Sequence, residues 1–374
     1  MNPRLLSIEP SLIRALHAKR KPDSIDLGLG EPTLLPQQRF LEAATRWASE
    51  FGTKYTVNAG DAATREKIAA HYAYPGMSEA RNVCLTTGSQ EAVFITIKTM
   101  LDPATDELLV VEPAFPAYVK MAQLEGVPTR RVQMREEHLY RYDIDAVVAA
   151  IGPKTRLIAI GSPGNPTGRV LTRSDAQRLA KALGERPGPP VWVLHDEIYR
   201  ELTYIDGPGY VAEFYPHTIV ANSLSKSNAL TGMRIGWVMA PVPAIDALVL
   251  THSWVTATAS AFGQRVAYEI FSEPGALTEQ SQWYRKQREG VMSALDDSGL
   301  QYVEPDGAFY ACVRLPNGGD SIAAAHTLVD HRGVVAIPGR IFGETLEGWL
   351  RLSWVAPLPA FREGLRRIAD LTSS

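Results

Sequence analysis

A lysine preceded by two serines and followed by an arginine is the most informative group of residues in this 374-residue sequence. Lys226 comes just after the largely apolar segment 218–222, with Ser223 and Ser225 before it and Arg234 beyond it. A lysine at the end of a buried strand loses its proton more readily than a solvated one, because burial disfavours the ammonium. A neutral lysine can form a Schiff base with an aldehyde cofactor, and the serines and Arg234 offer donors and charge for a cofactor phosphate. On its own, the pattern supports no more than a surface lysine after a strand with a structural arginine nearby.

Further chemically distinctive residues follow the other strands that we expect. Gly88-Ser89-Gln90, Phe115, Asn165 and Asp196 each come at the end of an apolar segment. Ligands of open α/β sheets bind beyond the carboxyl ends of the strands. Together with Lys226, these positions predict one site at that edge of a sheet.

The first three of these positions suit a flat, phosphorylated ligand. Gly88-Ser89-Gln90 opens a helix, so its N–H groups and the positive helix end suit a phosphate, although a plain turn would look the same. Phe115 can stack on a heteroaromatic ring or pack in the core. Asn165 stands in the segment 162–168, whose prolines and glycines predict a rigid loop that fixes one amide.

Two more positions bring opposite charges to the predicted site. A carboxylate such as Asp196 beside a pyridine nitrogen keeps that nitrogen protonated and makes the ring an electron sink. His195 and Glu197, its neighbours, are alternative polar residues for the site. Arg351 has the guanidinium fork that binds a carboxylate through two hydrogen bonds, and a structural salt bridge is its alternative role.

In this order, the motifs resemble those of the class I/II aminotransferases of fold-type I, which use pyridoxal 5'-phosphate (PLP). The resemblance runs from about residue 25 to about residue 355. It implies that Lys226 holds PLP as an internal aldimine and also moves the substrate proton. It implies that Asp196 meets the ring nitrogen and that Tyr199 and Asn165 meet the ring oxygen. It assigns the remaining cofactor contacts to Gly88, Ser89, Gln90, Phe115, Ser223, Ser225 and Arg234.

The resemblance also implies how substrates bind and which reaction follows. Arg351 is the expected partner of the substrate α-carboxylate, with Gly30 and Asn165 beside it. Tyr55 resembles the tyrosine that reaches the phosphate from a neighbouring subunit, so we expect a homodimer. The expected reaction moves an amino group from an α-amino acid to a 2-oxo acid, either 2-oxoglutarate or pyruvate. A carbon–sulfur lyase, a cyclase or another non-transaminating enzyme of this fold would share the motifs, and a PLP-binding sensor is a further alternative.

Two residues depart from the family pattern. Asn228 stands where relatives often carry an aromatic residue, and Arg340 stands where a small hydroxyl residue is more usual. Arg340 is interpreted as a surface charge, but it would favour acidic substrates if it faced the site. Because no other second arginine is recognisable, the sequence favours neutral or varied amino acids.

The elements that must position these residues alternate along the chain. Apolar segments at 82–86, 107–111, 157–161, 191–195, 218–222 and 236–239 predict strands buried on both faces. Helical patterns at 90–100, 116–125 and 173–183 lie between them, the last with Thr172 as N-cap. This alternation predicts an open, mostly parallel α/β sheet. A long helical pattern at 278–295 precedes shorter strand-like segments at 308–314, 334–337 and 350–353, which with the N-terminal segment predict a smaller α+β domain.

We therefore expect residues 1–40 to form an N-terminal segment of the small domain, 41–284 the large PLP-binding domain, and 285–374 the C-terminal part of the small domain.

Composition narrows the functional class further. The 45% hydrophobic and 21% charged residues are typical of a globular protein. A net charge of −3 without a basic patch speaks against nucleic acid as a partner. Cys84 and Cys312 lack metal-ligand spacing, so no metal is expected, and they fit core positions in a reducing compartment. No segment has the roughly 18 apolar residues of a membrane span or an N-terminal signal, which predicts a cytoplasmic protein.

Overall fold

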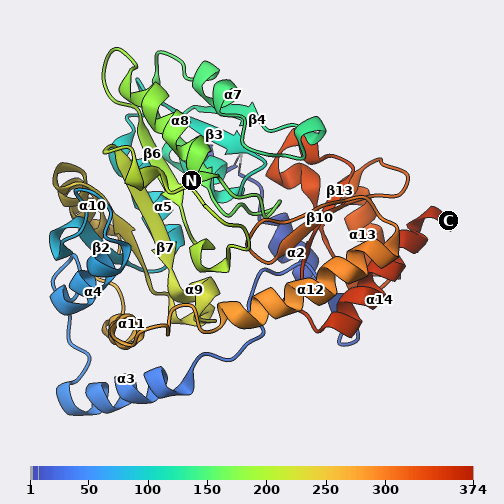
Figure 1. The fold of residues 1–374 in the computed structure, drawn as a ribbon, viewed down its shortest axis with the longest axis horizontal. Helices are drawn as coiled ribbons and strands as arrows, with labels where there is room; N and C mark the ends of the chain where they lie inside the picture. Colours follow the sequence, from blue (N-terminus) through green and yellow to red (C-terminus); the bar gives the residue numbers. More distant parts are fainter. Residues whose placement is uncertain (1–2, 7, 374) are drawn as a thin grey trace.

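The computed structural model describes residues 3–6 and 8–373 of the chain. At its centre lies a seven-stranded sheet in the order β2-β8-β7-β6-β5-β3-β4 (Figure 1). β8 is antiparallel to both of its neighbours, and every other pair in this sheet is parallel. The strands are β2 Val83–Thr86, β3 Glu107–Glu112, β4 Thr129–Gln133, β5 Thr155–Gly161, β6 Trp192–Asp196, β7 Thr218–Ser223 and β8 Gly236–Met239. The predicted mostly parallel α/β architecture is confirmed.

Helices cover both faces of the central sheet, which explains why its strands are apolar on both sides. One face packs through residues such as Leu108 and Val238 against α5 Ser89–Met100, α6 Ala117–Glu125 and α10 Val242–Val255. The other face packs through residues such as Ile158 and Trp237 against α4 Ala62–Tyr72, α7 Ile144–Ala149, α8 Arg173–Gly184 and α11 Ala261–Ser272.

A smaller α+β part is built from both ends of the chain, as the sequence predicts. Its antiparallel sheet has the order β12-β13-β10-β9, and β1 near the N-terminus pairs in parallel with β11. The strands are β1 Ile25–Asp26, β9 Tyr302–Val303, β10 Tyr310–Arg314, β11 Val334–Val335, β12 Ile337–Pro338 and β13 Trp349–Ser353. The helices are α2 Leu12–Ala18, α12 Ser281–Ser298, α13 Ser321–His331 and α14 Leu358–Ala369. The short helix α1, Pro3–Leu6, instead contacts α6 beside the central sheet. α12 packs on α14, and Figure 1 shows these two helices beside β10, β13 and α13.

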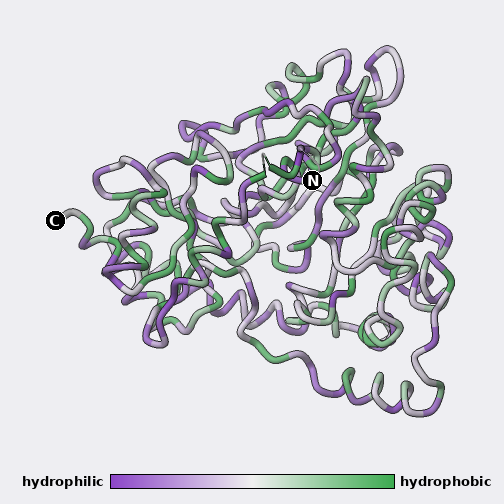
Figure 2. The backbone as a smooth tube through the Cα atoms, turned by 180° about the vertical axis from the view of Figure 1, so that it is seen from behind, coloured by the Kyte–Doolittle hydropathy of each residue, from purple (hydrophilic) through white to green (hydrophobic). Residues whose placement is uncertain are grey.

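One helix stands apart from all three sheets. α3, Gln38–Phe51, packs on α11 at the edge of the molecule, and Figures 1 and 2 show it projecting from the body in both views. Its last residue, Phe51, and the segments that flank it expose large apolar side chains, among them Leu35, Tyr55 and Val57. Such a surface is unusual for a face in contact with water alone.

The element predictions hold with shifts of a few residues at the ends. α5 begins at Ser89 rather than at residue 90, and α12 begins at Ser281 rather than at residue 278. Thr172 caps α8 through a reciprocal capping box with Asp175, as predicted. β4 was not predicted, because its sequence Thr-Arg-Arg-Val-Gln is polar and it lies at the edge of the sheet. Among the described residues, no helix is long and apolar enough to cross a membrane.

Candidate active site

A cavity of about 1030 Å³ lies at the carboxyl ends of the parallel strands and gathers most of the predicted site residues. Its lining includes Gly30, Ser89, Gln90, Phe115, Asn165, Asp196, Tyr199, Ser225, Lys226, Arg234 and Arg351. Gly88, Ser223 and Tyr55 are not part of the lining. The cavity therefore lies at the edge of the sheet where the sequence predicts a site.

Lys226 is brought into the cavity by a turn at the end of β7. The Ser223 hydroxyl accepts a hydrogen bond from the Ser225 N–H at 3.2 Å and so begins the short helix α9, Leu224–Ser227. Lys226 Nζ donates a hydrogen bond to the Gly30 carbonyl at 2.5 Å. Burial, and after it the positive charge of Arg351, lower the pKa of Lys226 to about 8. At pH 7 about a tenth of this amine is therefore neutral and able to attack an aldehyde, far more than for a solvated lysine.

Asp196, the last residue of β6, is held by two donors. Tyr118 donates its hydroxyl to Asp196 Oδ2 at 2.8 Å, and the Ile198 N–H donates to Oδ1 at 3.2 Å. Burial raises the pKa of Asp196, while the two donors favour the ionised form. Among the described residues no cation pairs with this carboxylate, so it is suited to a cationic group on a ligand. No sequence motif indicates this role of Tyr118, although it lies near Phe115 on the same edge of the sheet.

Tyr199 forms a pair with a second tyrosine that was also not predicted. The hydroxyls of Tyr199 and Tyr310 lie 2.7 Å apart, and both side chains are buried. Burial raises the pKa of Tyr199 well above its usual value, so the phenol stays a neutral hydrogen-bond donor. A Cβ atom on Gly30 would overlap the Tyr310 hydroxyl, which explains why a glycine stands there.

Arg351 points from β13 into the same cavity and is only 2% exposed. Its Nη1 donates to Asn165 Oδ1 at 3.1 Å, its Nη2 donates to the Gly28 carbonyl, and the guanidinium lies 4.5 Å from the centre of the Tyr310 ring. Its Nε is buried and lacks a partner, and no carboxylate of the described residues pairs with it. The structural salt bridge considered above is therefore not present, and the guanidinium is available for a carboxylate of a ligand.

An anion site lies at the start of α5. Gly88 precedes the helix with a φ of 80°, a conformation that favours glycine, and a Cβ there would come 2.5 Å from Arg234 Nη2. Arg234 donates to the carbonyls of Thr231 at 2.9 Å and Thr87 at 3.2 Å, and no acid of the described residues pairs with it. The first N–H groups of a helix have no partner inside the helix, so those of Ser89 together with Arg234 suit a phosphate.

The groups in this cavity fit PLP. A lysine of lowered pKa matches its aldehyde, the start of α5 with Arg234 matches its phosphate, and a buried carboxylate without a cation matches its ring nitrogen. The arginine with an unpartnered Nε matches the carboxylate of an amino acid.

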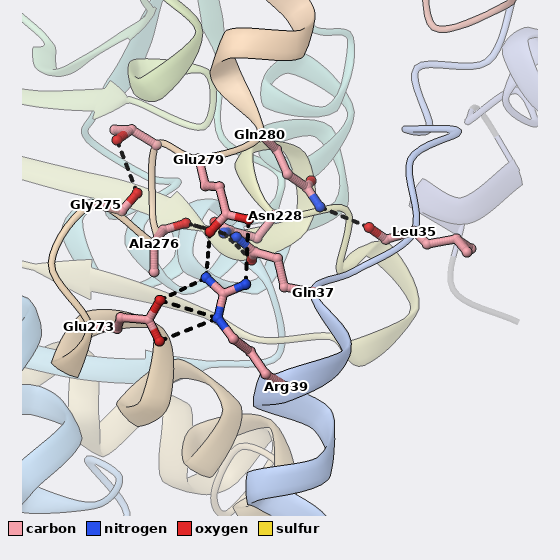
Figure 3. Close-up of polar contacts among 10 residues, drawn as sticks. Leu35, Gln37, Arg39, Asn228, Glu273, Gly275, Ala276, Glu279 and Gln280 are labelled. Carbon is pink, nitrogen blue, oxygen red and sulfur yellow. Dashed lines mark hydrogen bonds and ion pairs between the residues drawn. The ribbon is translucent and has the colours of Figure 1, made fainter.

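The two departures from the family pattern have different places. Asn228 is fully buried and turned away from the cavity: its amide donates to Gln37 Oε1 and to the Ala276 carbonyl, both at 3.1 Å (Figure 3). It thereby ties the lysine loop to the segment before α3 and to the connection between α11 and α12. An exposed ion pair between Arg39, in the first turn of α3, and Glu273, drawn in the same figure, also ties α3 to the connection between α11 and α12.

Arg340 and Tyr55 lie farther out. Arg340 lines the outer part of the cavity, but its side chain is 60% exposed and pairs with Glu347 at 3.2 Å. Tyr55 is 90% exposed and does not reach the cavity of its own chain. Its loop is held to the residues after α10 by Thr56, whose hydroxyl lies 2.6 Å from that of Thr258.

A model of the family described as aminotransferase class I and II matches residues 22–368. The chain belongs to this family. An aspartate aminotransferase of Pyrococcus horikoshii is 33% identical over 376 residues, which cover 98% of this chain and 95% of the relative. A probable N-acetyl-LL-diaminopimelate aminotransferase of Bacillus subtilis is 32% identical over 98% of this chain and 94% of the relative. The solved structure of Thermus thermophilus aspartate aminotransferase with maleate has a TM-score of 0.91 at 29% identity, and the match covers 99% of both chains.

Membership in this family identifies the type of enzyme. The class I and II aminotransferases use PLP, and this chain is an amino-acid aminotransferase that works on amino acids and keto acids. The family leaves the individual substrates and the roles of single residues open.

Proposed function

We propose that Lys226 of this aminotransferase binds PLP and acts as the base and acid of the reaction. The observation that carries the proposal is the single cavity that holds Lys226, Asp196, Arg351 and the start of α5. When bound, PLP supplies an aldehyde that takes up the amino group and a ring that delocalises the charge left by the broken Cα–H bond. Lys226, with its pKa lowered to about 8, removes the proton at the substrate Cα as a base and gives up a proton as an acid.

The surrounding residues would hold the cofactor ring and its phosphate. Asp196, kept ionised by Tyr118, faces the ring nitrogen, and Tyr199 donates to the ring oxygen as a neutral phenol. Asn165 is the second contact of that oxygen, and Phe115 stacks on the ring. Contacts with the phosphate come from Gly88, Ser89, Gln90, Ser225 and Arg234. Ser223 contributes indirectly, because its hydroxyl caps α9, the short helix that carries Ser225 and Lys226.

Arg351 would bind the α-carboxylate of the amino acid. Asn165 already accepts a hydrogen bond from its Nη1, which fixes the guanidinium in one orientation. Gly30 leaves room between Tyr310 and Lys226 and offers its carbonyl to Nζ. The amino group is thus placed beside Lys226 while the rest of the substrate extends into the outer cavity.

We further propose a homodimer in which Tyr55 of the partner subunit completes each phosphate site. The support is an exposed apolar surface formed by Phe51, Tyr55 and Val57 with Leu250 and Trp254 of α10. The contact between Thr56 and Thr258 holds its two halves side by side. A second copy that covers this surface would remove it from water. Light scattering should give a dimer, and Tyr55→Phe should weaken PLP retention more than the rate of proton transfer; an active monomer contradicts the proposal.

Domain boundaries and cellular location are proposals as well. We propose a large domain of residues 41–284 and a small domain of residues 1–40 and 285–374, because the pairing of β1 with β11 ties the N-terminal segment to the C-terminal part. Cys84 and Cys312 are both buried and free, which supports the cytoplasm as the location.

The amino acid and the 2-oxo acid are tested by a single-turnover screen. Holoenzyme is mixed with single amino acids, and the spectral change from the PLP form to the pyridoxamine phosphate form is recorded. Addition of 2-oxoglutarate or pyruvate, the acceptors we propose, should restore the first spectrum. Ammonia and pyruvate released without the pyridoxamine form would indicate a lyase, and bound PLP without a response to any amino acid would indicate a sensor.

A further inference from the structure

Two cations that line the cavity, Arg14 and Lys120, have no partner among the described residues once the inner site is assigned. Arg131 and Arg340 also line the cavity, but Arg131 lies 3.6 Å from Glu112, and Arg340 lies 3.2 Å from Glu347. The side chains of Arg14 and Lys120 make no hydrogen bond or ion pair with any described residue. An unpaired cation in a substrate cavity is a candidate for contact with an anion of the substrate.

The two cations are presented by well-anchored helices. Arg14 belongs to α2, where Leu16 is buried, His17 lies 2.7 Å from Asp26, and Lys19 pairs with Asp330 at 2.9 Å. Lys120 is half-buried on α6, the helix that also carries Tyr118. Because α2 packs on α13 of the smaller part and α6 packs on the central sheet, the two side chains reach the cavity from different parts of the fold.

Arg14 is also electrostatically coupled to the reacting end of the cavity. After burial and the charge of Arg351, the charges of Arg234 and Arg14 further lower the pKa of Lys226, against the opposing charge of Glu31. Arg351 and Arg234 already have partners in the proposed function. Arg14 is therefore a cation near the cofactor lysine that has no assigned role.

We propose that Arg14 and Lys120 form a second anion subsite, which binds the distal carboxylate of dicarboxylic amino acids and 2-oxo acids. This inference rests on the proposed function, in which Arg351 takes the α-carboxylate. A cavity of about 1030 Å³ has room for the cofactor and a four- or five-carbon diacid. Exposed Glu9 and Glu344 line the same cavity and would favour a distal cation instead, so the experiment includes basic substrates.

The test compares two non-reacting acids of equal chain length, succinate and butyrate, which differ by one carboxylate. Their dissociation constants for the holoenzyme are measured by calorimetry. Arg14→Gln should weaken succinate binding by about 10- to 100-fold and Lys120→Gln by about threefold or more, while butyrate binding stays within about twofold. Lys19→Gln is the matched control, because Lys19 is a cation at the end of the same helix that does not line the cavity. The proposal is overturned if Arg14→Gln weakens both acids equally or leaves succinate unchanged, or if Lys19→Gln has the same effect.

A kinetic comparison separates failure of this subsite from failure of the proposed function. The wild type should convert glutamate faster than glutamine or lysine, and Arg14→Gln should abolish the preference for glutamate over glutamine. Faster turnover of lysine would refute the anion subsite but leave the aminotransferase proposal intact. If no amino acid yields the pyridoxamine form, the proposed function itself fails, and the subsite proposal fails with it.

Discussion

Tyr118→Phe removes one hydroxyl from the active site and retains the aromatic ring. Asp196 is 6% exposed and has two donors, the Tyr118 hydroxyl at 2.8 Å and the Ile198 N–H at 3.2 Å. Loss of a hydrogen bond to a charged buried group costs about 1.5–3 kcal/mol, which corresponds to a factor of about 10 to 100. Because burial already raises the pKa of Asp196, loss of this donor should raise it further.

The assay is the single-turnover rate of amino transfer as a function of pH. We expect the maximal rate of Tyr118→Phe to fall by about 10- to 100-fold. The acid limb of its pH–rate profile should also move to higher pH, because catalysis needs ionised Asp196 and the pKa of this residue is raised. Tyr142→Phe is the control, since the Tyr142 hydroxyl donates to the Gly161 carbonyl at 2.5 Å rather than to Asp196. Equal losses in both variants, or an unchanged acid limb in Tyr118→Phe, would refute this account of Asp196.

Two more predictions concern the cofactor site. The rate of PLP uptake by the apoenzyme should rise with pH and level off above about pH 8, because the neutral form of Lys226 reacts. Stopped-flow absorbance measures this rate. A rate that still rises near pH 10 would contradict the lowered pKa of Lys226. Gly236→Ala should weaken PLP retention during dialysis by about tenfold or more, because its Cβ would lie 2.7 Å from Gly88 C and Ser89 N and displace the phosphate site. Gly184→Ala, with no heavy atom within 4 Å of its Cβ, should have no such effect, and similar losses in both would argue against a steric cause.

Local sequence patterns were sufficient to predict the elements that carry the site. Strands such as β6 and β7 are apolar because helices cover both faces of the sheet, so their ends could be located from the sequence. Lys226, Asp196 and Arg351 each follow or occupy such a segment, and the cavity brings them together. β4 escaped prediction because an edge strand can expose its arginines and lacks the apolar pattern of a central strand.

The sequence could not show which way a side chain turns outside these elements. Asn228 stands close to Lys226 but hydrogen-bonds with Gln37, far away in the sequence. Tyr118 and Tyr310 acquire their roles only through contacts with Asp196 and Tyr199, which come from other strands and loops. Such contacts follow from how the chain packs rather than from periodicity, so no local pattern indicated them.

Arg14 illustrates the same limit for the substrate. From the sequence alone, Arg340 is the one recognisable candidate for a second arginine at the substrate. Both Arg340 and Arg14 are exposed and line the cavity, but Arg340 pairs with Glu347, whereas Arg14, on the N-terminal helix α2, forms no ion pair with the described residues. α2 is far in sequence from the arginine motif around Arg351, and it comes near that motif because β1, which follows α2, pairs with β11.

The central claim, that Lys226 is the residue that binds PLP, can be tested directly by chemical trapping. Holoenzyme is reduced with borohydride, digested, and its peptides are sequenced by mass spectrometry. The account predicts one pyridoxyl label per chain, on the peptide that contains Lys226. It also predicts that Lys226→Ala keeps PLP only non-covalently, through the phosphate contacts, and carries no label after reduction. A label on any other lysine of the wild-type chain, or a labelled Lys226→Ala variant, would contradict it.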